Sequence, residues 1–327
     1  MNPALLLLTD SRLPAGGHAH SGGTEQAIAT GAVHDLTSLA AFLRGRLHTS
    51  GHVAAALAAA ACALSATHSP DTAPDPVAAP DPTSGPVSTC GPGPVSTSAL
   101  VSGIGMADAR RAREAAGRAR TEAAGASWDL LDAEADARTA SPAQRDASRI
   151  QGRLLLRVAR RLWPSSVLDG LAQAVPNPHH PIALGAAAQA AGASPGDAAL
   201  AAAYHAITGP ATAAVRLLGL DPVAVHGLLA DLTPDLATTA ATVTAAATTL
   251  ATAATTATAA TTATLVAAAT TATADMADMA ARAAESPGTP GTSLADRLWA
   301  ELPARSAPAL DLLAERHAGA KVRLFVS

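Results

Sequence analysis

The residues with the widest chemical options lie near the N-terminus, where two histidines stand within a glycine-rich segment. Residues 10–25 contain His18 and His20 together with one proline and four glycines. Imidazole nitrogens bind metals or anions, and a glycine-rich loop that leads into a helix can present backbone N–H groups to a ligand. A glycine-rich turn ahead of a helix capped by Ser21 would give the same pattern without a ligand. Because stable metal sites use three or four ligands and no HExxH spacing is present, we favour the structural interpretation.

A second histidine pair, His179 and His180, precedes a predicted helix. Adjacent side chains diverge, so we expect at most one of them to face any given site. A core or helix-capping role is therefore the favoured interpretation of this pair. The alternative is a histidine-dependent metal-binding protein or metalloenzyme that uses His18, His20, His179 or His180.

Arginines recur every four residues along a predicted helix, beside an apolar stripe. The series consists of Arg145, Arg149, Arg153, Arg157 and Arg161. It can dock an acidic partner, or it can pair with the carboxylates just upstream, which are Asp129, Asp132, Glu134 and Asp136. Such a series is more often solvated, and exposed pairs add little stability. We therefore give less weight to partner docking by the whole series.

The sequence does not support catalysis. Lys321 is its single lysine, so no P-loop can form and the chain cannot hydrolyse nucleotides by that route. There is no GxSxG motif, and Cys62 and Cys90 are far apart and belong to no CxxC pair. A net charge of -4 and a pI near 6.2 provide no basic field for nucleic acid. We expect a non-enzyme without a tightly bound cofactor.

The chain is expected to be cytoplasmic and not membrane-bound. Its cysteine usage fits a reducing compartment. Residues 1–9 lack the basic region and the long apolar core of a signal peptide. The longest strongly apolar stretch, Val53–Leu64, is shorter than the ~20 residues that span a bilayer.

The elements that must position these residues are predicted to be helices. The composition is 49% hydrophobic but 2% aromatic, which favours an all-α core of Ala, Leu and Val. Start signals precede helices at Ser141-Pro142, Ser194-Pro195, Asp221-Pro222 and Thr233-Pro234, and a further helix begins at Asp35 or Thr37. Stop signals occur at Gly31 and at Gly209-Pro210. Val53–Leu64 is apolar on most of its circumference and is predicted to be central.

Two low-complexity insertions are predicted within one helical domain. Residues 1–67, 106–235 and 275–327 form the N-terminal, central and C-terminal parts of the domain, and the last ends in a docking tail. Residues 68–105 are rich in Pro, Ser and Gly, and we expect them to be disordered. Residues 236–274 are almost entirely Ala and Thr, and we expect a frayed helix or disorder because too few bulky apolar residues recur at helical spacing.

Five colinear blocks resemble the UreF family of urease accessory proteins. The first combines residues 5–14 (LLLLTDSRLP), 16–17 (GG) and 20–23 (HSGG). The others are residues 147–155 (ASRIQGRLL), 180–185 (HPIALG), 214–217 (AVRL) and 311–327, which end in RLFVS. Each block is weak alone, but five in the right order are specific.

This resemblance implies a dimeric all-α scaffold that bridges the accessory protein UreD (UreH) and the GTPase UreG while nickel is delivered to apo-urease. GTP would be bound by UreG, and nickel would contact this chain only transiently, with His20 and His317 as candidates. The implied UreD-facing residues are Arg316, His317, Arg323, Leu324, Phe325 and Ser327. The implied dimer or UreG-facing residues are Asp10, Pro14, Gly16, Gly17, His20, Ser21, Arg149, Gly152 and Arg153. A further alternative is a helical adaptor unrelated to urease, whose Pro-rich segment recruits a peptide-binding domain.

Overall fold

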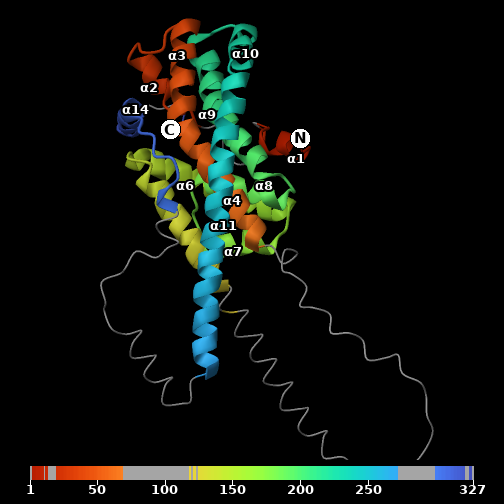
Figure 1. The fold of residues 1–327 in the computed structure, drawn as a ribbon. Coiled ribbons are helices and arrows are strands. Elements are labelled where there is room, and N and C mark those ends of the chain that lie inside the picture. Colours follow the sequence, from red (N-terminus) through yellow and green to blue (C-terminus); the bar gives the residue numbers. More distant parts are fainter. Residues whose placement is uncertain are drawn as a thin grey trace, which may run out of the picture.

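Helices account for every regular element in the parts of the chain that are described, so the all-α prediction is confirmed (Figure 1). The computed structural model describes residues 2–10, 12–13, 20–68, 118, 121–122, 124–271, 299–320 and 324–325, with the backbone alone over 257–271. Apart from residue 68, the predicted Pro-rich insertion at 68–105 lies outside this description.

Four helices form the centre of the molecule. They are α4 (His52–His68), α8 (His180–Ala190), α9 (Pro195–Leu218) and α11 (Thr233–Thr271), and α4 packs against the other three. Their facing positions are mostly alanine, which lets the helix axes approach closely. At the tightest point, a Cβ atom on Gly185 of α8 would lie 2.2 Å from the carbonyl oxygen of Ala58 on α4. The predicted central role of residues 53–64 is confirmed.

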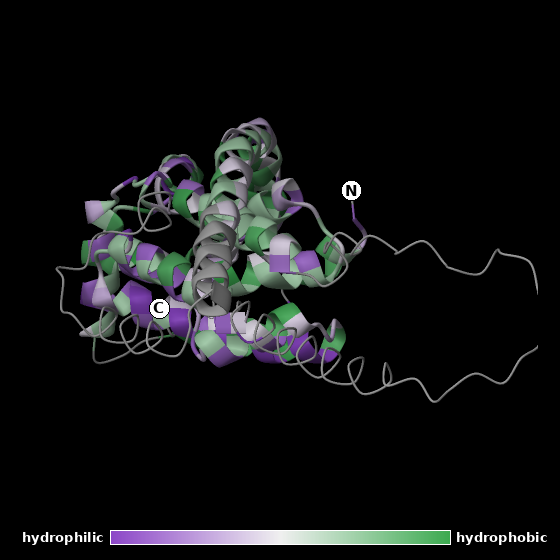
Figure 2. Ribbon diagram, turned by 60° about the horizontal axis from the view of Figure 1, so that its bottom comes forward, coloured by the Kyte–Doolittle hydropathy of each residue, from purple (hydrophilic) through white to green (hydrophobic). Residues whose placement is uncertain are grey.

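The remaining helices surround this centre and carry most of the hydrophilic residues (Figure 2). At the N-terminal end lie α1 (Ala4–Leu8), α2 (Thr24–Ala29), α3 (Leu36–Arg46) and the π-helical turn η2 (Leu47–Gly51), and the last two run directly into α4. Further along are a helix that includes residues 124–137, α6 (Pro142–Leu162), α7 (Ser166–Ala174), α10 (Pro222–Asp231) and α14 (Pro308–Ala318). The segment Leu36–His68 is long and apolar enough to cross a membrane, but 78% of its most apolar window is buried in this protein, as in a core helix.

Most predicted helix starts are confirmed. The side chains of Asp35, Ser141, Ser194 and Asp221 each accept a hydrogen bond from a backbone N–H in the first turn of their helix. The proposed cap at Ser21 is wrong. The N-cap of α2 is Gly23, whose φ of 85° lies in the left-handed region, which glycine adopts without a steric penalty.

The predicted stop at Gly209-Pro210 is also wrong, because α9 continues through Pro210 to Leu218. Proline has no N–H, so the carbonyl of Ala206 loses its partner four residues on. Arg46 supplies a replacement, since its Nε donates to this carbonyl at 3.0 Å. The break that proline imposes on an isolated helix is thus repaired by a side chain from α3.

The interpretation of residues 236–274 as lacking a core-facing surface is wrong over the first half of α11. Buried positions recur every three or four residues, and they are Leu236, Ala240, Val243, Ala247, Ala251 and Ala254. Alanine suffices here because α4 and α9 lie close enough to contact a methyl group. Several threonine hydroxyls donate a hydrogen bond to the backbone carbonyl oxygen four residues earlier, as Thr244 does to Ala240 at 2.6 Å. The hydroxyl groups are thereby satisfied within the helix itself.

Candidate functional site

The structure places ten of the residues implied by the resemblance. The other five, Pro14, Gly16, Gly17, Arg323 and Ser327, lie outside the description, and so does His18, a candidate from the glycine-rich segment. Asp10 is held locally by a bidentate contact from Arg12, whose hydrogen bonds keep the pKa of the Asp10 carboxyl below its usual value. Arg153 and Arg316 are exposed, whereas His20, Ser21 and His317 are buried.

The C-terminal segment is fastened to α2 through its backbone. The Glu25 carboxylate accepts hydrogen bonds from the backbone N–H groups of Leu324 (2.9 Å) and Phe325 (3.1 Å). His317, whose side chain is only 3% exposed, contacts both Glu25 and the tail. Its Nδ1 lies 3.6 Å from Glu25 Oε2, and its Nε2 lies 3.2 Å from the carbonyl oxygen of Phe325. The sequence left open whether the tail is tucked onto the core or presented to a partner. In the described part of the tail the backbone of Leu324 and Phe325 is anchored, while the Leu324 side chain remains 72% exposed.

The helix that carries His317 is locked onto the start of α6. Glu315 Oε1 accepts from the Ser141 hydroxyl at 2.5 Å and from the backbone N–H of Ala143 at 2.9 Å. These hydrogen bonds hold the pKa of the Glu315 carboxyl below its usual value. Gln144 adds a contact to Asp311 at 3.2 Å. The helix cap at Ser141, which is local in sequence, therefore also positions α14.

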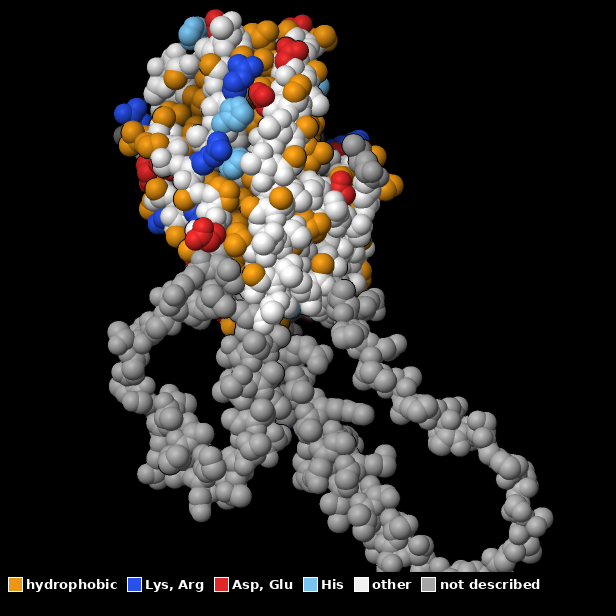
Figure 3. Space-filling view, viewed as in Figure 1, with side chains coloured by type: hydrophobic (Ala, Val, Ile, Leu, Met, Phe, Trp, Pro, Cys, Tyr) orange, Lys and Arg blue, Asp and Glu red, His pale blue; other side chains and the backbone are white. Residues whose placement is uncertain are grey.

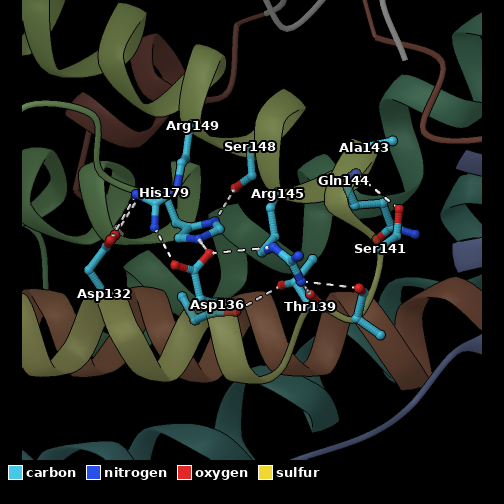
Figure 4. Close-up of polar contacts among 12 residues, drawn as sticks. Asp132, Asp136, Thr139, Ser141, Ala143, Gln144, Arg145, Ser148, Arg149 and His179 are labelled. Carbon is cyan, nitrogen blue, oxygen red and sulfur yellow. Dashed lines mark hydrogen bonds and ion pairs between the residues drawn. The ribbon is translucent and has the colours of Figure 1, made fainter. Parts of the chain in front are cut away.

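Arg149 lies at the centre of a charged cluster between α6 and the helix of residues 124–137 (Figure 4). Its guanidinium donates to Asp132 at 2.8 Å, to Asp136 at 2.6 Å and to the carbonyl of Asn177 at 2.8 Å. Of the two alternatives for the arginine series, internal pairing holds for this residue. Arg153, one turn further along α6, is exposed.

His179 completes this cluster. Its Nε2 lies 2.8 Å from Asp136 Oδ1, its Nδ1 lies 3.0 Å from the Ser148 hydroxyl, and its backbone N–H donates to Asp132 at 3.0 Å. Burial lowers the pKa of His179, whereas Asp136 opposes that shift. Burial also works against ionisation of Asp136, but the hydrogen bonds from His179 and Arg149 outweigh it and lower the Asp136 pKa.

Asp132, Asp136 and His179 are close enough to hold a metal ion, since their ligand atoms lie within 4.8 Å of one another. The Arg149 guanidinium already contacts both carboxylates, however, and balances their charge. A divalent cation would have to displace it. The arrangement is therefore better suited to fixing the turn before α8 than to binding metal.

Gly152 allows α6 to approach that turn. A Cβ atom at this position would lie 2.0 Å from the carbonyl oxygen of Pro178 and 2.9 Å from the backbone nitrogen of His180. The RIQG and HPIALG blocks, which are separate in sequence, thus meet in one contact. Sequence reasoning missed this pairing, because neither block carries a local signal for the other.

A cavity of about 590 Å³ opens between the central helices and the unit formed by α6 and α14. Five histidines line it, and they are His20, His179, His180, His205 and His317. The ring centroids of His180 and His205 are 5.7 Å apart. Burial lowers the pKa of His180 to about 3 and that of His205 to about 4, so both are neutral at pH 7.

The prediction that at most one residue of the His179 and His180 pair faces a given site is wrong for this cavity, because both residues line it. The two rings do diverge, because His179 contacts Asp136 and His180 contacts His205. Both nevertheless line the same cavity, since it extends around the turn that carries them. Sequence reasoning missed His205, which lies in an alanine-rich helix without any local motif.

Comparison with known proteins agrees with the blocks that meet in this region. The sequence profile of the family UreF matches residues 96–233. The urease accessory protein UreF of Mycolicibacterium vanbaalenii is 40% identical over 237 residues, which cover 72% of this chain and 83% of the relative. The proteins of the same name from Mycobacterium sp. (strain JLS) and Mycobacterium marinum are 40% and 39% identical, over 72% of this chain and 84% and 82% of their own lengths.

Proposed function

Because the chain belongs to the UreF family of urease accessory proteins, we propose that it is a non-catalytic scaffold of urease maturation. In this role it bridges a UreD (UreH) protein and the GTPase UreG during nickel insertion into apo-urease. The observation that carries the proposal is the 40% identity to proteins named urease accessory protein UreF, over more than four fifths of their length. The absence of a P-loop lysine supports a division of labour in which UreG binds GTP.

The C-terminal segment is the proposed UreD-docking surface. Glu25 and His317 hold its backbone in place, so the Leu324 side chain is presented at little entropic cost when a partner binds. Leu312 on the neighbouring α14 is 60% exposed and adds apolar area. We propose that these two exposed leucines supply the apolar part of the docking surface.

Co-purification with the UreD and UreG proteins of the same host, followed by sizing of the complex, tests this proposal. We expect a three-component complex and a homodimer of this chain within it. Deleting Val322–Ser327 should abolish capture of UreD while the helical circular dichroism signal is retained. Leu324→Asp should do the same, whereas Val223→Asp, at a 78% exposed apolar position on α10, is the matched control and should leave capture intact. Unchanged capture by the Leu324 variant would contradict the tail assignment.

Nickel is proposed to contact this chain only in passing, at the histidine-lined cavity. His20 and His317, the two candidates from the sequence, both line it. The low pKa values of His180 and His205 leave their ring nitrogens available as ligands at neutral pH. Equilibrium dialysis of the isolated chain against Ni²⁺ should give weak, substoichiometric binding. Tight stoichiometric binding would instead favour a histidine-dependent metal-binding protein.

We place this activity in the cytoplasm. The cysteine usage supports a reducing compartment, and within the described residues the one helix that is both long and apolar enough for a membrane is mostly buried in the protein. Fractionation of host cells would check the assignment, and recovery of the chain in the membrane pellet would contradict it.

A further inference from the structure

Three parts of the chain that are far apart in sequence meet around the side chain of Arg46. They are residues 20–23 at the end of the glycine-rich segment, the junction between α3 and η2, and the middle of α9. Residues 20–23 lie directly on α9, because a Cβ atom on Gly22 would be only 3.0 Å from Cγ of Pro210. The φ of 59° at Gly22 is a second reason for glycine at this position.

Arg46 joins these parts through hydrogen bonds to two backbone carbonyl groups. Its Nη1 donates to the carbonyl oxygen of Gly22 at 2.5 Å, and its Nε donates to that of Ala206 at 3.0 Å. The guanidinium group is planar and rigid, so it holds the two acceptors at a fixed separation. Among the described residues no carboxylate pairs with Arg46. Its contacts therefore position the backbone rather than balance a charge.

The neighbouring basic residues of α3 and η2 lie at the surface instead. Figure 3 shows basic and histidine side chains gathered over these elements, where Arg44 and His48 lie 3.6 and 3.9 Å from the Asp235 carboxylate. Arg46 points inward, and burial lowers its pKa to about 10, which leaves it charged at pH 7. Enclosing a cation in this way is costly unless its donors are satisfied, and the two carbonyl groups satisfy them in part.

The carbonyl group of Ala206 is available to Arg46 because residue 210 is proline. In an unbroken α-helix the N–H of residue 210 would donate to this carbonyl, and proline has no N–H. The hydrogen bond from Arg46 therefore replaces a bond within α9 and at the same time ties residues 20–23 to that helix. The position of the glycine-rich segment thus depends on a proline in a different element.

From these contacts we propose that Arg46 is the positioning residue for residues 20–23, and that Pro210 makes this possible by freeing the carbonyl to which Arg46 is fastened. The functional consequence rests on the proposed scaffold role, in which this segment, with His20 and Ser21, faces a second subunit or UreG. Arg46 is not among the residues that the family resemblance implies, and it joins them through its contact with Gly22.

Hydrogen exchange of the full chain, followed by mass spectrometry of its peptides, tests the proposal without a partner protein. In Arg46→Met, the peptide that covers residues 20–24 should exchange about tenfold faster, because it loses a charge-assisted hydrogen bond. Arg44→Met is the matched control on the same helix, and it should change this exchange by less than about twofold. Unchanged exchange in Arg46→Met would overturn the proposal, and so would an equal rise in the central helix α4, which would indicate general destabilisation.

Pro210→Ala separates the two contacts of Arg46. Alanine supplies an N–H to the Ala206 carbonyl, so in the Arg46→Met background it should restore exchange of residues 206–214 to within about twofold of wild type. Residues 20–24 should remain fast, since alanine provides no donor to Gly22. Restoration of both peptides would show that Arg46 only repairs α9 and would overturn the proposal. Failure to restore residues 206–214 would contradict the part assigned to Pro210.

Gly22→Ala tests the same contact if Arg46→Met does not fold. The added Cβ atom would lie 3.2 Å from both Cζ and Nη2 of Arg46, so it should push residues 20–23 away from the guanidinium group and speed their exchange. Gly31→Ala is the control for backbone strain, because Gly31 has a φ of 76° and nothing lies within 4 Å of a Cβ atom there. Equal exchange of residues 20–24 in the two variants would argue against the contact and overturn the proposal.

Sizing of the chain and capture of UreG then test the functional consequence. Arg46→Met should lower dimer formation or UreG capture together with the faster exchange of residues 20–24. Faster exchange with unchanged assembly would leave Arg46 as the positioning residue but would contradict the partner-facing role of the segment. If the wild-type chain neither dimerises nor captures UreG, the proposed function fails, and the exchange results still decide whether Arg46 positions residues 20–23.

Discussion

Replacing Gly152 by alanine should destabilise the protein strongly. A Cβ atom would lie 2.0 Å from the carbonyl oxygen of Pro178, a separation that non-bonded atoms do not reach. The obstacle is backbone, so relief requires α6 and the turn before α8 to separate by about 1 Å. That movement would stretch the contacts of Arg149 with Asn177 and of Ser148 with His179.

The magnitude combines two effects of opposite sign. Alanine in place of glycine within a helix gains about 0.5–1 kcal/mol. Overpacking of a closed interface costs about 1–3 kcal/mol, and weakening a partly buried charge network adds to this. We expect a net loss of about 2 kcal/mol or more in the free energy of unfolding.

Urea unfolding followed by circular dichroism measures this loss, and Gly170→Ala is the matched control. Gly170 lies within α7, and nothing lies within 4 Å of a Cβ atom built there. Its replacement should therefore stabilise the protein by about 0.5–1 kcal/mol. Opposite signs for the two variants would support the reasoning. A neutral or stabilising Gly152→Ala would refute the close approach of α6 to the turn.

Three further predictions concern buried or partly buried groups. The free energy of unfolding should fall as the pH drops below about 6.5, because His180 and His205 titrate at about 3 and 4 when folded but near 6.5 when unfolded. The free energy of unfolding should change by on the order of 1–2 kcal/mol per pH unit down to about pH 4. In the variant His180→Gln this dependence on pH should be weaker, which unfolding measured at pH 7 and at pH 5 would show. Ala247→Glu should cost several kcal/mol because it buries a charge on α11, whereas the exposed Thr248→Glu should be nearly neutral in the same assay. Glu25→Gln should speed amide hydrogen exchange at Leu324 and Phe325 by about tenfold, since it weakens two charge-assisted hydrogen bonds, and unchanged exchange would contradict the anchoring role of Glu25.

The parts of the fold that were predictable from sequence depend on short-range interactions. The caps at Asp35, Ser141, Ser194 and Asp221 form within three residues of the capping side chain, so their signal is complete in the local sequence. The central position of residues 53–64 follows from an apolar circumference. The composition alone indicated an all-α chain.

The parts that were not predictable depend on partners far along the chain. Pro210 stops a helix unless something occupies the carbonyl that it frees, and the occupant, Arg46, is 160 positions away from Ala206. The packing of α11 could not be read from its alanines, because a methyl group becomes a core contact only when the facing helices are close. His205 carries no local motif, and its neighbour His180 becomes visible only once α8 lies beside α9.

The anchoring of the C-terminal segment has a consequence for how the two groups of implied site residues work. The resemblance to the UreF family implies a UreD-facing tail and a second, N-terminal and central group that faces the dimer or UreG, and both assignments are proposals. Glu25 joins the tail to α2 directly, and Glu315 joins α14 to the start of α6, the helix that carries Arg149 and Gly152. The C-terminal segment and α14 are therefore hydrogen-bonded directly to both elements of the second group. Under the proposed scaffold role, a partner bound at the tail would contact a segment that is hydrogen-bonded to both elements of the second group.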